Sequence, residues 1–196
     1  IAGADTRKAL NALHEEFFEK TYKQINLFVV GTGNVGGRLL AQFKQQQEYL
    51  RQKGNLQVRI IGLANSRKMV FADEGIALNN WQEALAGGEP SNLDLFVQRM
   101  QEKNLRNSVL VDVTANEQVA SVYERVFQKS ISVVACNKIA AASSFARYRN
   151  LKDLCAEYKA SFHFETNVGA SLPIIGTLND LVRSGDTVHR IEAVLS

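Results

Sequence analysis

Three glycines stand at a spacing that would let the backbone approach a phosphate group. Gly31, Gly33 and Gly36 form the pattern Gly-x-Gly-x-x-Gly. In such a pattern the first glycine permits a tight turn, the second close approach of a pyrophosphate, and the third close packing of a helix on its strand. The helix N-terminus would add free N–H groups and the positive end of its dipole. The pattern predicts a dinucleotide-binding loop made of Gly31, Thr32, Gly33, Asn34, Val35 and Gly36.

A second cluster of polar residues lies where a bound dinucleotide would place its adenosine ribose. Asn65, Ser66, Arg67 and Lys68 follow an apolar run at residues 58–64, and no carboxylate stands among them. An Asp or Glu there would bind the 2′-hydroxyl of NAD, whereas basic residues accommodate the 2′-phosphate of NADP. The cluster favours NADP, with NAD as the other option. The alternative is that Arg67 and Lys68 are solvated loop charges.

Two later strand ends carry polar residues that would face the same crevice. Thr114, Ala115 and Asn116 follow the run at residues 109–113, and they are candidate cofactor contacts or simply the cap of the next helix. Lys138 follows the run at residues 131–135, where a cation could orient a carboxylate or polarise a carbonyl group. The alternative for Lys138 is an ordinary surface lysine.

A carboxylate followed by a glycine-containing loop marks residues 165–173. Glu165 and the loop carbonyls could wrap a small cation, because carboxylate and carbonyl oxygens are suitable ligands. A tight loop without a ligand explains the same residues. Pro173 is expected in the first turn of a helix at residues 174–183.

The elements that must position these residues alternate between strand and helix. Such an order predicts a Rossmann-type doubly wound α/β fold with a parallel sheet and right-handed crossovers. Capping boxes are expected at Ser91 and at Thr114. The expected strands are residues 25–30, 58–64, 109–113, 131–135 and 161–165, and the expected helices are residues 1–20, 34–53, 81–85, 93–103, 118–128, 144–158 and 174–183.

Composition narrows the class of protein. The chain of 196 residues has 23 Lys and Arg against 20 Asp and Glu, a net charge of +3 without a dense basic block, so nucleic-acid binding is not indicated. No apolar run is long enough to span a membrane, and no targeting segment is visible. Cys136 and Cys155 are not spaced as a metal pair. These features predict a cytoplasmic protein that does not bind membranes.

Several of these motifs resemble one known family. Residues 31–36, 64–67, 112–115, 137–138 and above all 166–173 are similar to homoserine dehydrogenases, particularly the dehydrogenase half of bifunctional aspartate kinase/homoserine dehydrogenases. Residues 12–18 also resemble the end of the regulatory region that precedes the dehydrogenase in those fused enzymes.

The resemblance implies reversible hydride transfer between NAD(P)H and aspartate 4-semialdehyde, which gives homoserine on the route to threonine and methionine. It implies a small-molecule substrate and a homo-oligomeric full-length protein. Asn137 joins the expected cofactor contacts, and Lys138 becomes the expected catalytic residue, for substrate polarisation or proton relay. It also implies a monovalent cation, sodium or potassium, at Glu165 with the backbone of Val168, Ala170 and Leu172.

The same resemblance predicts a domain division and a fragment. Residues 1–24 are expected to form a connector helix, residues 25–168 the dinucleotide-binding domain, and residues 169–196 the start of a substrate and dimerisation region. The sequence lacks an initiator Met, and its alternating run at residues 188–195 looks like a strand. Because the family's substrate residues lie beyond Ser196, we expect cofactor binding with little or no turnover.

Two other readings remain open. The first is an aldehyde dehydrogenase that forms a thioester on Cys136, which needs a thiolate beside a base. The second is a non-catalytic module that senses a nucleotide. Substitution of Cys136 tests the first, and substitution of Lys138 tests the second.

Overall fold

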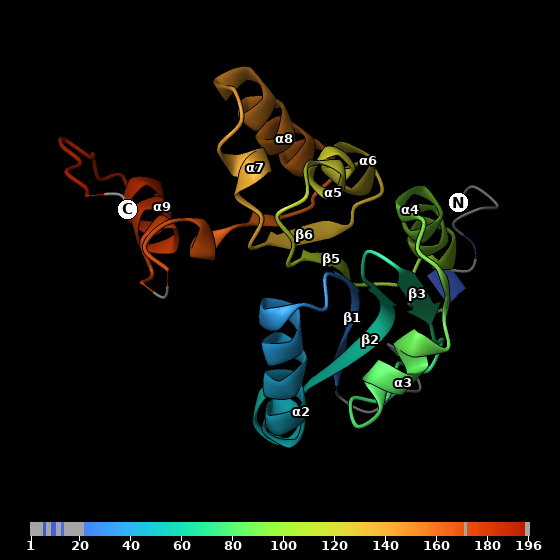
Figure 1. Ribbon diagram of the computed structural model, residues 1–196. Helices are drawn as coiled ribbons and strands as arrows, with labels where there is room; N and C mark the ends of the chain where they lie inside the picture. The colour runs from blue at the N-terminus through green and yellow to red at the C-terminus, as the bar shows by residue number, and fades with distance from the viewer. Residues whose placement is uncertain (1–5, 7–8, 11–12, 14–21, 171, 195–196) are drawn as a thin grey trace.

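A seven-stranded sheet forms the centre of the molecule. The computed structural model describes residues 6, 9, 10, 13, 22–170 and 172–194, and its strands lie in the order β4-β3-β2-β1-β5-β6-β7 (Figure 1). Five neighbouring strands are parallel, as predicted, which confirms the doubly wound α/β fold. They are β1 (Lys23–Val30), β2 (Leu56–Ala64), β5 (Ser108–Asp112), β6 (Ser132–Ala135) and β7 (Phe162–His163).

Two short antiparallel strands extend the sheet beyond β2 and were not predicted. They are β3 (Lys68–Phe71) and β4 (Glu89–Pro90). Pro90 is tolerated because β4 is an edge strand and the missing N–H is not needed there. Strands β3 and β4 can pair closely because Gly88, just before β4, has no side chain. A Cβ atom at this position would be 2.3 Å from the Met69 carbonyl oxygen.

Helices cover both faces of the sheet and build two hydrophobic cores. Along β1, Phe28 and Val30 face one core, whereas Leu27 and Val29 face the other. The alternation follows from the two-residue period of a strand. The first core lies against α4 (Leu93–Lys103), α5 (Glu117–Ser121), α6 (Tyr123–Phe127) and α8 (Phe145–Glu157), and the second against α2 (Asn34–Gly54) and α3 (Trp81–Ala86) (Figure 1).

Most helix boundaries follow the predicted ones, and two caps were wrong. Asn92 rather than Ser91 caps α4, accepting a hydrogen bond from the Leu95 amide. Asn116 rather than Thr114 caps α5: its Oδ1 accepts from the Gln118 amide, whereas the Thr114 Oγ1 accepts from the amide of Asn116 itself. The single helix predicted at residues 118–128 is divided at Val122 into α5 and α6.

The last part of the chain departs from prediction more strongly. Only Phe162 and His163 form strand β7, and a short 3₁₀ helix, η2 (Glu165–Asn167), replaces the predicted end of that strand. Ile174 is the N-cap of α9 (Ile175–Arg183), so Pro173 precedes the cap instead of lying in the first turn. Residues 186–194 have no regular secondary structure, so the strand predicted at residues 188–195 is wrong for this part. A strand forms only with a partner to bond its backbone groups.

The predicted helix at residues 1–20 lies mostly outside the described residues. Thr6, Ala9, Leu10 and Leu13 are helical. No helix in the described part of the chain combines the length and the apolar character that crossing a membrane requires.

Candidate functional site

The carboxyl ends of four strands lie in one row and bring the predicted polar segments together. Val30 at the end of β1 is in register with Ala64 of β2 on one side and Asp112 of β5 on the other, and Asp112 is in register with Ala135 of β6. After β1 the chain passes through α2 to β2 on one side of β1, whereas β5 lies on the other side. The carboxyl ends of β1 and β5 therefore flank the topological switch point. A crevice at such a point is where open α/β sheets bind ligands.

The glycine loop is shaped for a phosphate group. Gly31 has a φ of +105°, and a Cβ atom there would lie 2.9 Å from the Val113 carbonyl oxygen. Both the backbone conformation and this close contact therefore exclude a side chain at position 31. A Cβ atom on Gly36 would lie 2.1 Å from the Gly31 carbonyl oxygen. At Gly33 the situation is the opposite, because nothing lies within 4 Å of the Cβ position. A side chain at position 33 would fill that open space, which leaves room for a phosphate group to approach the backbone.

The start of α2 adds donors to this space. Gly33 is the N-cap, and no side chain caps the helix or places a negative charge in its first turn. The first amide groups of a helix have no partner within it, and they favour an anion. Asn34 and Val35 are exposed beside them. These features fit the pyrophosphate of a dinucleotide.

The turn between β2 and β3 holds the predicted ribose cluster. Asn65 shapes the turn, because its Oδ1 accepts hydrogen bonds from the amides of Arg67 and Lys68, both at 2.8 Å. The side chains of Ser66 and Arg67 are exposed. Lys68 instead donates from Nζ to the Gly88 carbonyl oxygen at 2.8 Å. The Lys68 ammonium has two further donors, so Lys68 stays a candidate cofactor contact. Its side chain is less free to move than that of Arg67, because one donor is already engaged.

A buried carboxylate, not predicted as a site residue, lies under the opposite half of the crevice. Asp112 is fully buried and accepts four hydrogen bonds. Its Oδ1 accepts from the amide and the hydroxyl of Thr114, at 2.8 and 2.7 Å, and its Oδ2 accepts from Tyr123 Oη at 2.6 Å and Asn137 Nδ2 at 2.9 Å. Burial and the neighbouring carboxylate raise the pKa of Tyr123, so the phenol remains a donor.

The loop after β5 is held by this carboxylate and exposes its tip. Thr114 is half-buried because both of its donors point to Asp112, while Ala115 and Asn116 are exposed at the crevice. The Thr114 Oγ1 also accepts a hydrogen bond from the Asn116 amide at 3.2 Å. Asn116 therefore confirms that this segment caps the next helix, and contact of the exposed tip with a cofactor stays a prediction.

The residues after β6 include the predicted lysine. Asn137 is buried, whereas Lys138 is exposed as the first residue of α7 (Lys138–Ala141). The Asn137 Oδ1 accepts from the Ile139 amide at 3.1 Å and so caps this helix. Lys138 follows directly as an exposed residue after the carboxyl end of β6.

The predicted cation loop is arranged around Glu165. Its two carboxylate oxygens accept hydrogen bonds from the amides of Ile175 and Gly176, at 2.8 and 2.7 Å, so that Glu165 holds the start of α9. Each oxygen keeps a second lone pair for another ligand. Gly169 and Ala170 both have positive φ values, +69° and +51°. The Leu172 carbonyl oxygen accepts from the Ile174 amide at 2.9 Å, so part of the expected donor set is already engaged.

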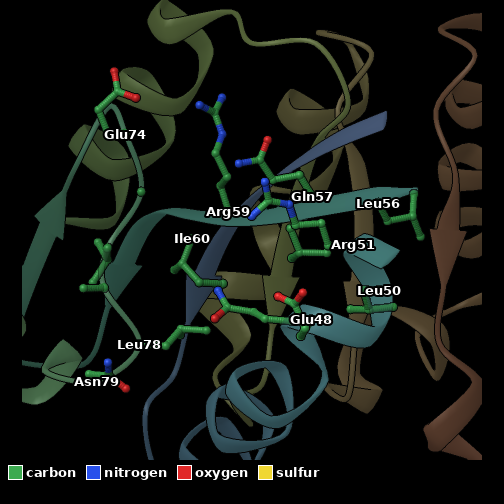
Figure 2. A pocket seen from close by; sticks show the side chains of 15 residues that line it. Glu48, Leu50, Arg51, Leu56, Gln57, Arg59, Ile60, Glu74, Leu78 and Asn79 are labelled. Atoms are coloured by element: carbon green, nitrogen blue, oxygen red, sulfur yellow. The ribbon is translucent and has the colours of Figure 1, made fainter. Parts of the chain in front are cut away.

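Several cavities lie away from the ribose turn, and one of them, of about 520 Å³, is lined by Glu165 among other residues. Another, of about 400 Å³, is at the other end of the sheet where β2 begins, and Glu48, Arg51, Arg59 and Glu74 are among the residues that line it (Figure 2). No predicted site residue lines this cavity. A third, of about 580 Å³, is almost wholly apolar and lies between α2 and β6, with Asn34 and Val35 at its border. The candidate site is the crevice at the strand ends, where the predicted polar segments lie.

A mostly parallel sheet with helices on both faces and a glycine-lined crevice at its switch point defines a dinucleotide-binding α/β domain. Residues 31–165 match the family described as homoserine dehydrogenase, NAD binding domain. The chain belongs to this family, which confirms the resemblance seen in the motifs.

Named relatives agree with the family. The chain is 40% identical over 195 residues to bifunctional aspartokinase/homoserine dehydrogenase 1, chloroplastic, of Zea mays, which covers 98% of this chain and 21% of that protein. It is 35% identical over 190 residues to the bifunctional aspartokinase/homoserine dehydrogenase of Haemophilus influenzae, covering 96% of this chain and 23% of that protein. The chain thus spans about a fifth of the length of these relatives.

Solved structures show the same fold. A hyperthermophilic archaeal homoserine dehydrogenase in complex with NADPH matches with a TM-score of 0.65 and 24% identity, over 80% of this chain and 48% of that chain. Homoserine dehydrogenase from Thermoplasma acidophilum matches with a TM-score of 0.65 and 19% identity, over 83% of this chain and 49% of that chain.

Proposed function

We propose that the chain is the NADP(H)-binding part of a homoserine dehydrogenase, which transfers a hydride reversibly between NAD(P)H and aspartate 4-semialdehyde to give homoserine. The observation that carries this proposal is the open space at Gly33 beside the uncapped start of α2, within residues that match the family. The backbone at Gly31 and Gly36 holds the loop, and the amides of α2 face the phosphates. Threonine and methionine biosynthesis is the expected pathway.

Preference for NADP over NAD rests on the ribose turn. Arg67 is exposed there, and its guanidinium can pair with a dianionic phosphate in a fork. Ser66 beside it can donate a hydrogen bond. No carboxylate occurs in residues 65–68 to bind a free 2′-hydroxyl or to repel the phosphate. The phosphate of NADP therefore gains contacts that NAD lacks.

A titration of the 196-residue chain tests the cofactor assignment. Nicotinamide fluorescence is followed while the chain is added to NADPH or NADH, with Arg67→Ala beside the original sequence. We expect NADPH to bind more tightly, and Arg67→Ala to weaken NADPH about tenfold or more with little change for NADH, since charge-assisted hydrogen bonds contribute about 1.5–3 kcal/mol. Arg149→Ala, an exposed arginine on α8, is the matched control. Equal weakening of both cofactors by Arg67→Ala would refute the phosphate contact.

Lys138 is the proposed catalytic residue. It is exposed at the crevice and leads α7, so its ammonium could polarise the carbonyl of the semialdehyde or relay the hydroxyl proton of homoserine. In the complete dehydrogenase, Lys138→Ala should lower kcat for homoserine-dependent reduction of NADP by about 10²–10⁴-fold, with the Kd of NADPH nearly unchanged. Unchanged kcat would favour a nucleotide-sensing role instead.

The cation, domain and assembly assignments are also part of the proposal. Sodium or potassium would bind at Glu165 with carbonyl oxygens of Val168, Ala170 and Leu172. Residues 1–24 would connect to a preceding domain, residues 25–168 would bind the dinucleotide, and residues 169–196 would begin the substrate and dimerisation region. The complete enzyme would be a homo-oligomer. Light scattering of the complete enzyme, with and without the region after residue 168, tests that division.

The thioester alternative has less support. In the register of β6 and β7, His163 pairs with Val134 rather than with Cys136, and within the described residues no hydrogen bond joins the Cys136 thiol to a base. Loss of activity in Cys136→Ala would revive that mechanism, and retention of activity excludes it.

A cytoplasmic or organellar location depends on the source organism. Both cysteines are unpaired, which suits a reducing compartment, and we propose the cytoplasm. The relatives from plants are named as chloroplastic proteins. Cell fractionation tests this assignment.

A further inference from the structure

Among the residues that the structure describes, no cationic side chain forms an ion pair with the buried carboxylate of Asp112. Its four hydrogen bonds come from neutral donors on three residues. A buried charge is costly unless hydrogen bonds replace its hydration. An ionised carboxylate can only accept hydrogen bonds, so each neighbouring polar group must turn a donor toward it.

The neighbour that is most constrained is Asn137. Its Nδ2 donates to Asp112 Oδ2 and to the Asn116 carbonyl oxygen, both at 2.9 Å, and its Oδ1 accepts from the Ile139 amide at 3.1 Å. If the side-chain amide turned over, its oxygen would face the carboxylate and its NH₂ group would face an N–H donor. The charge of Asp112 therefore selects the orientation of Asn137 that caps α7.

The cap matters because α7 is too short to be held by its own hydrogen bonds. The helix has four residues, Lys138–Ala141, and a helix of this length is unstable unless its ends are fixed. Asn137 fixes the N-terminal end, and Lys138 is the next residue. The Asn137 carbonyl oxygen also accepts a hydrogen bond from Asn167 Nδ2 at 3.3 Å, so the same residue holds the segment after β7.

We infer that Asp112 is a positioning residue, which acts through the Asn137 amide to fix the start of α7 and thereby the place of Lys138 at the crevice. The inference deepens the proposed function and rests on it for the role of Lys138. The hydrogen bonds that link Asp112, Asn137 and the start of α7 do not depend on that role of Lys138. Asp112 itself is fully buried.

Tyr123 offers a matched control. It donates to the same oxygen of Asp112 as Asn137 does, at 2.6 Å, but it belongs to α6 and has no part in the link from Asp112 to Lys138. Tyr123→Phe therefore disturbs the buried carboxylate while it leaves the Asn137 bond in place. A general loss of stability and a loss of positioning can thus be separated.

The first experiment measures hydrogen exchange of the Ile139 amide by NMR in the 196-residue chain. We expect Asp112→Asn to accelerate exchange of this amide at least tenfold, and Tyr123→Phe to change it by less than about threefold even where both lower Tm equally. Unchanged exchange in Asp112→Asn, or equal acceleration in both variants, would overturn the inference.

A second set of variants applies if Asp112→Asn does not fold. The exchanged pair Asp112→Asn/Asn137→Asp keeps one carboxylate and one amide, so it should retain protection of the Ile139 amide that Asn137→Ala loses. Equal loss of protection in the exchanged pair and in Asn137→Ala would also overturn the inference.

The second experiment measures kcat and the Kd of NADPH in the complete dehydrogenase. Asp112→Asn should lower kcat at least tenfold while the Kd changes less than threefold, and Tyr123→Phe should keep kcat within about twofold. A fall of kcat in both variants in proportion to Tm would assign Asp112 a purely structural role. An original enzyme without homoserine-dependent activity would refute the proposed function, while the exchange experiment would still decide the positioning.

Discussion

The Cβ position of Gly36 lies 2.1 Å from the carbonyl oxygen of Gly31, closer than any side chain tolerates. The first turn of α2 thus rests directly on the turn that follows β1. This contact places the amides of α2 beside the open space at Gly33, where the proposed phosphate site lies.

Gly36→Ala should therefore destabilise the protein. The added methyl group forces the helix away from the loop, and overpacking of this kind typically costs about 1–3 kcal/mol. Gly37→Ala is the matched control on the same helix, because nothing lies within 4 Å of its Cβ position. That variant should be neutral or more stable by up to about 1 kcal/mol, since alanine favours helix. Urea unfolding measures both, and equal free energies of unfolding in the two variants would contradict the close contact.

Gly33→Ala should separate binding from stability. The backbone of Gly33 has φ −71° and ψ −155°, which other residues adopt, and its Cβ would enter open space. Stability should change by less than about 0.5 kcal/mol, as for most surface substitutions. The methyl group would occupy the proposed phosphate site, so NADPH affinity should fall at least tenfold in a fluorescence titration. Gly87→Ala, beside α3, is the control for an effect on affinity. Unchanged NADPH binding in Gly33→Ala would place the phosphates elsewhere.

The sequence predicted the parts of the site that neighbouring residues determine. The glycine loop was found because its turn and its helix contact are both encoded within residues 31–36. The parallel strands were found because strands buried on both faces are continuous apolar runs. Their register then follows from the fold, which is why Asn65, Thr114 and Lys138 came to the same edge of the sheet.

The parts that the sequence did not predict depend on contacts between distant segments. Asp112 was seen only as a strand residue within a family motif, because its donors Tyr123 and Asn137 are 11 and 25 residues away. A single aspartate in an apolar strand gives no signal that it will be bonded by other segments. Strands β3 and β4 have four and two residues, too few for a periodic pattern. Thr114 failed as a cap because its Oγ1 accepts from the amide of Asn116, which is itself the N-cap of α5.

Glu165→Ala should loosen α9. The carboxylate accepts hydrogen bonds from the amides of Ile175 and Gly176, and loss of a cap of this kind costs about 0.5–2 kcal/mol. Hydrogen exchange of the Leu178 amide, which donates to the Ile174 carbonyl oxygen, reports the local effect. Glu83→Ala, in the first turn of α3, is the matched control and should leave that amide unchanged. Equal exchange in all three proteins would show that the start of α9 does not depend on Glu165.

The same variant tests the proposed cation site. If sodium or potassium binds at Glu165, either ion should raise the Tm of the original chain above the effect of a bulky organic cation at equal ionic strength, because binding to the folded state stabilises it. The ion-specific increase should be absent in Glu165→Ala. An equal increase in both proteins would assign it to general screening.

Alkaline pH should destabilise the fold through two buried acids. Burial raises the pKa of Cys155 from 9.0 to about 11, and burial with the Asp112 carboxylate raises the pKa of Tyr123 above its ordinary value of 10.0. The folded chain keeps protons that the unfolded chain releases, so the free energy of unfolding falls as pH rises. The contribution of Cys155 is complete below pH 9.0 and is lost by about pH 11. The contribution of Tyr123 begins to fall near pH 10.0.

Matched variants isolate these contributions from the other groups that titrate at high pH. Urea unfolding of the original chain, Cys155→Ala and Tyr123→Phe at a series of pH values gives the difference in free energy at each pH. The advantage of the original chain over Cys155→Ala should shrink between pH 9.0 and about 11, and its advantage over Tyr123→Phe should shrink above pH 10.0. Below pH 9.0 both differences should be constant, because each group is then protonated in the folded and the unfolded chain. Parallel curves at all pH values would mean that neither acid keeps its proton on folding.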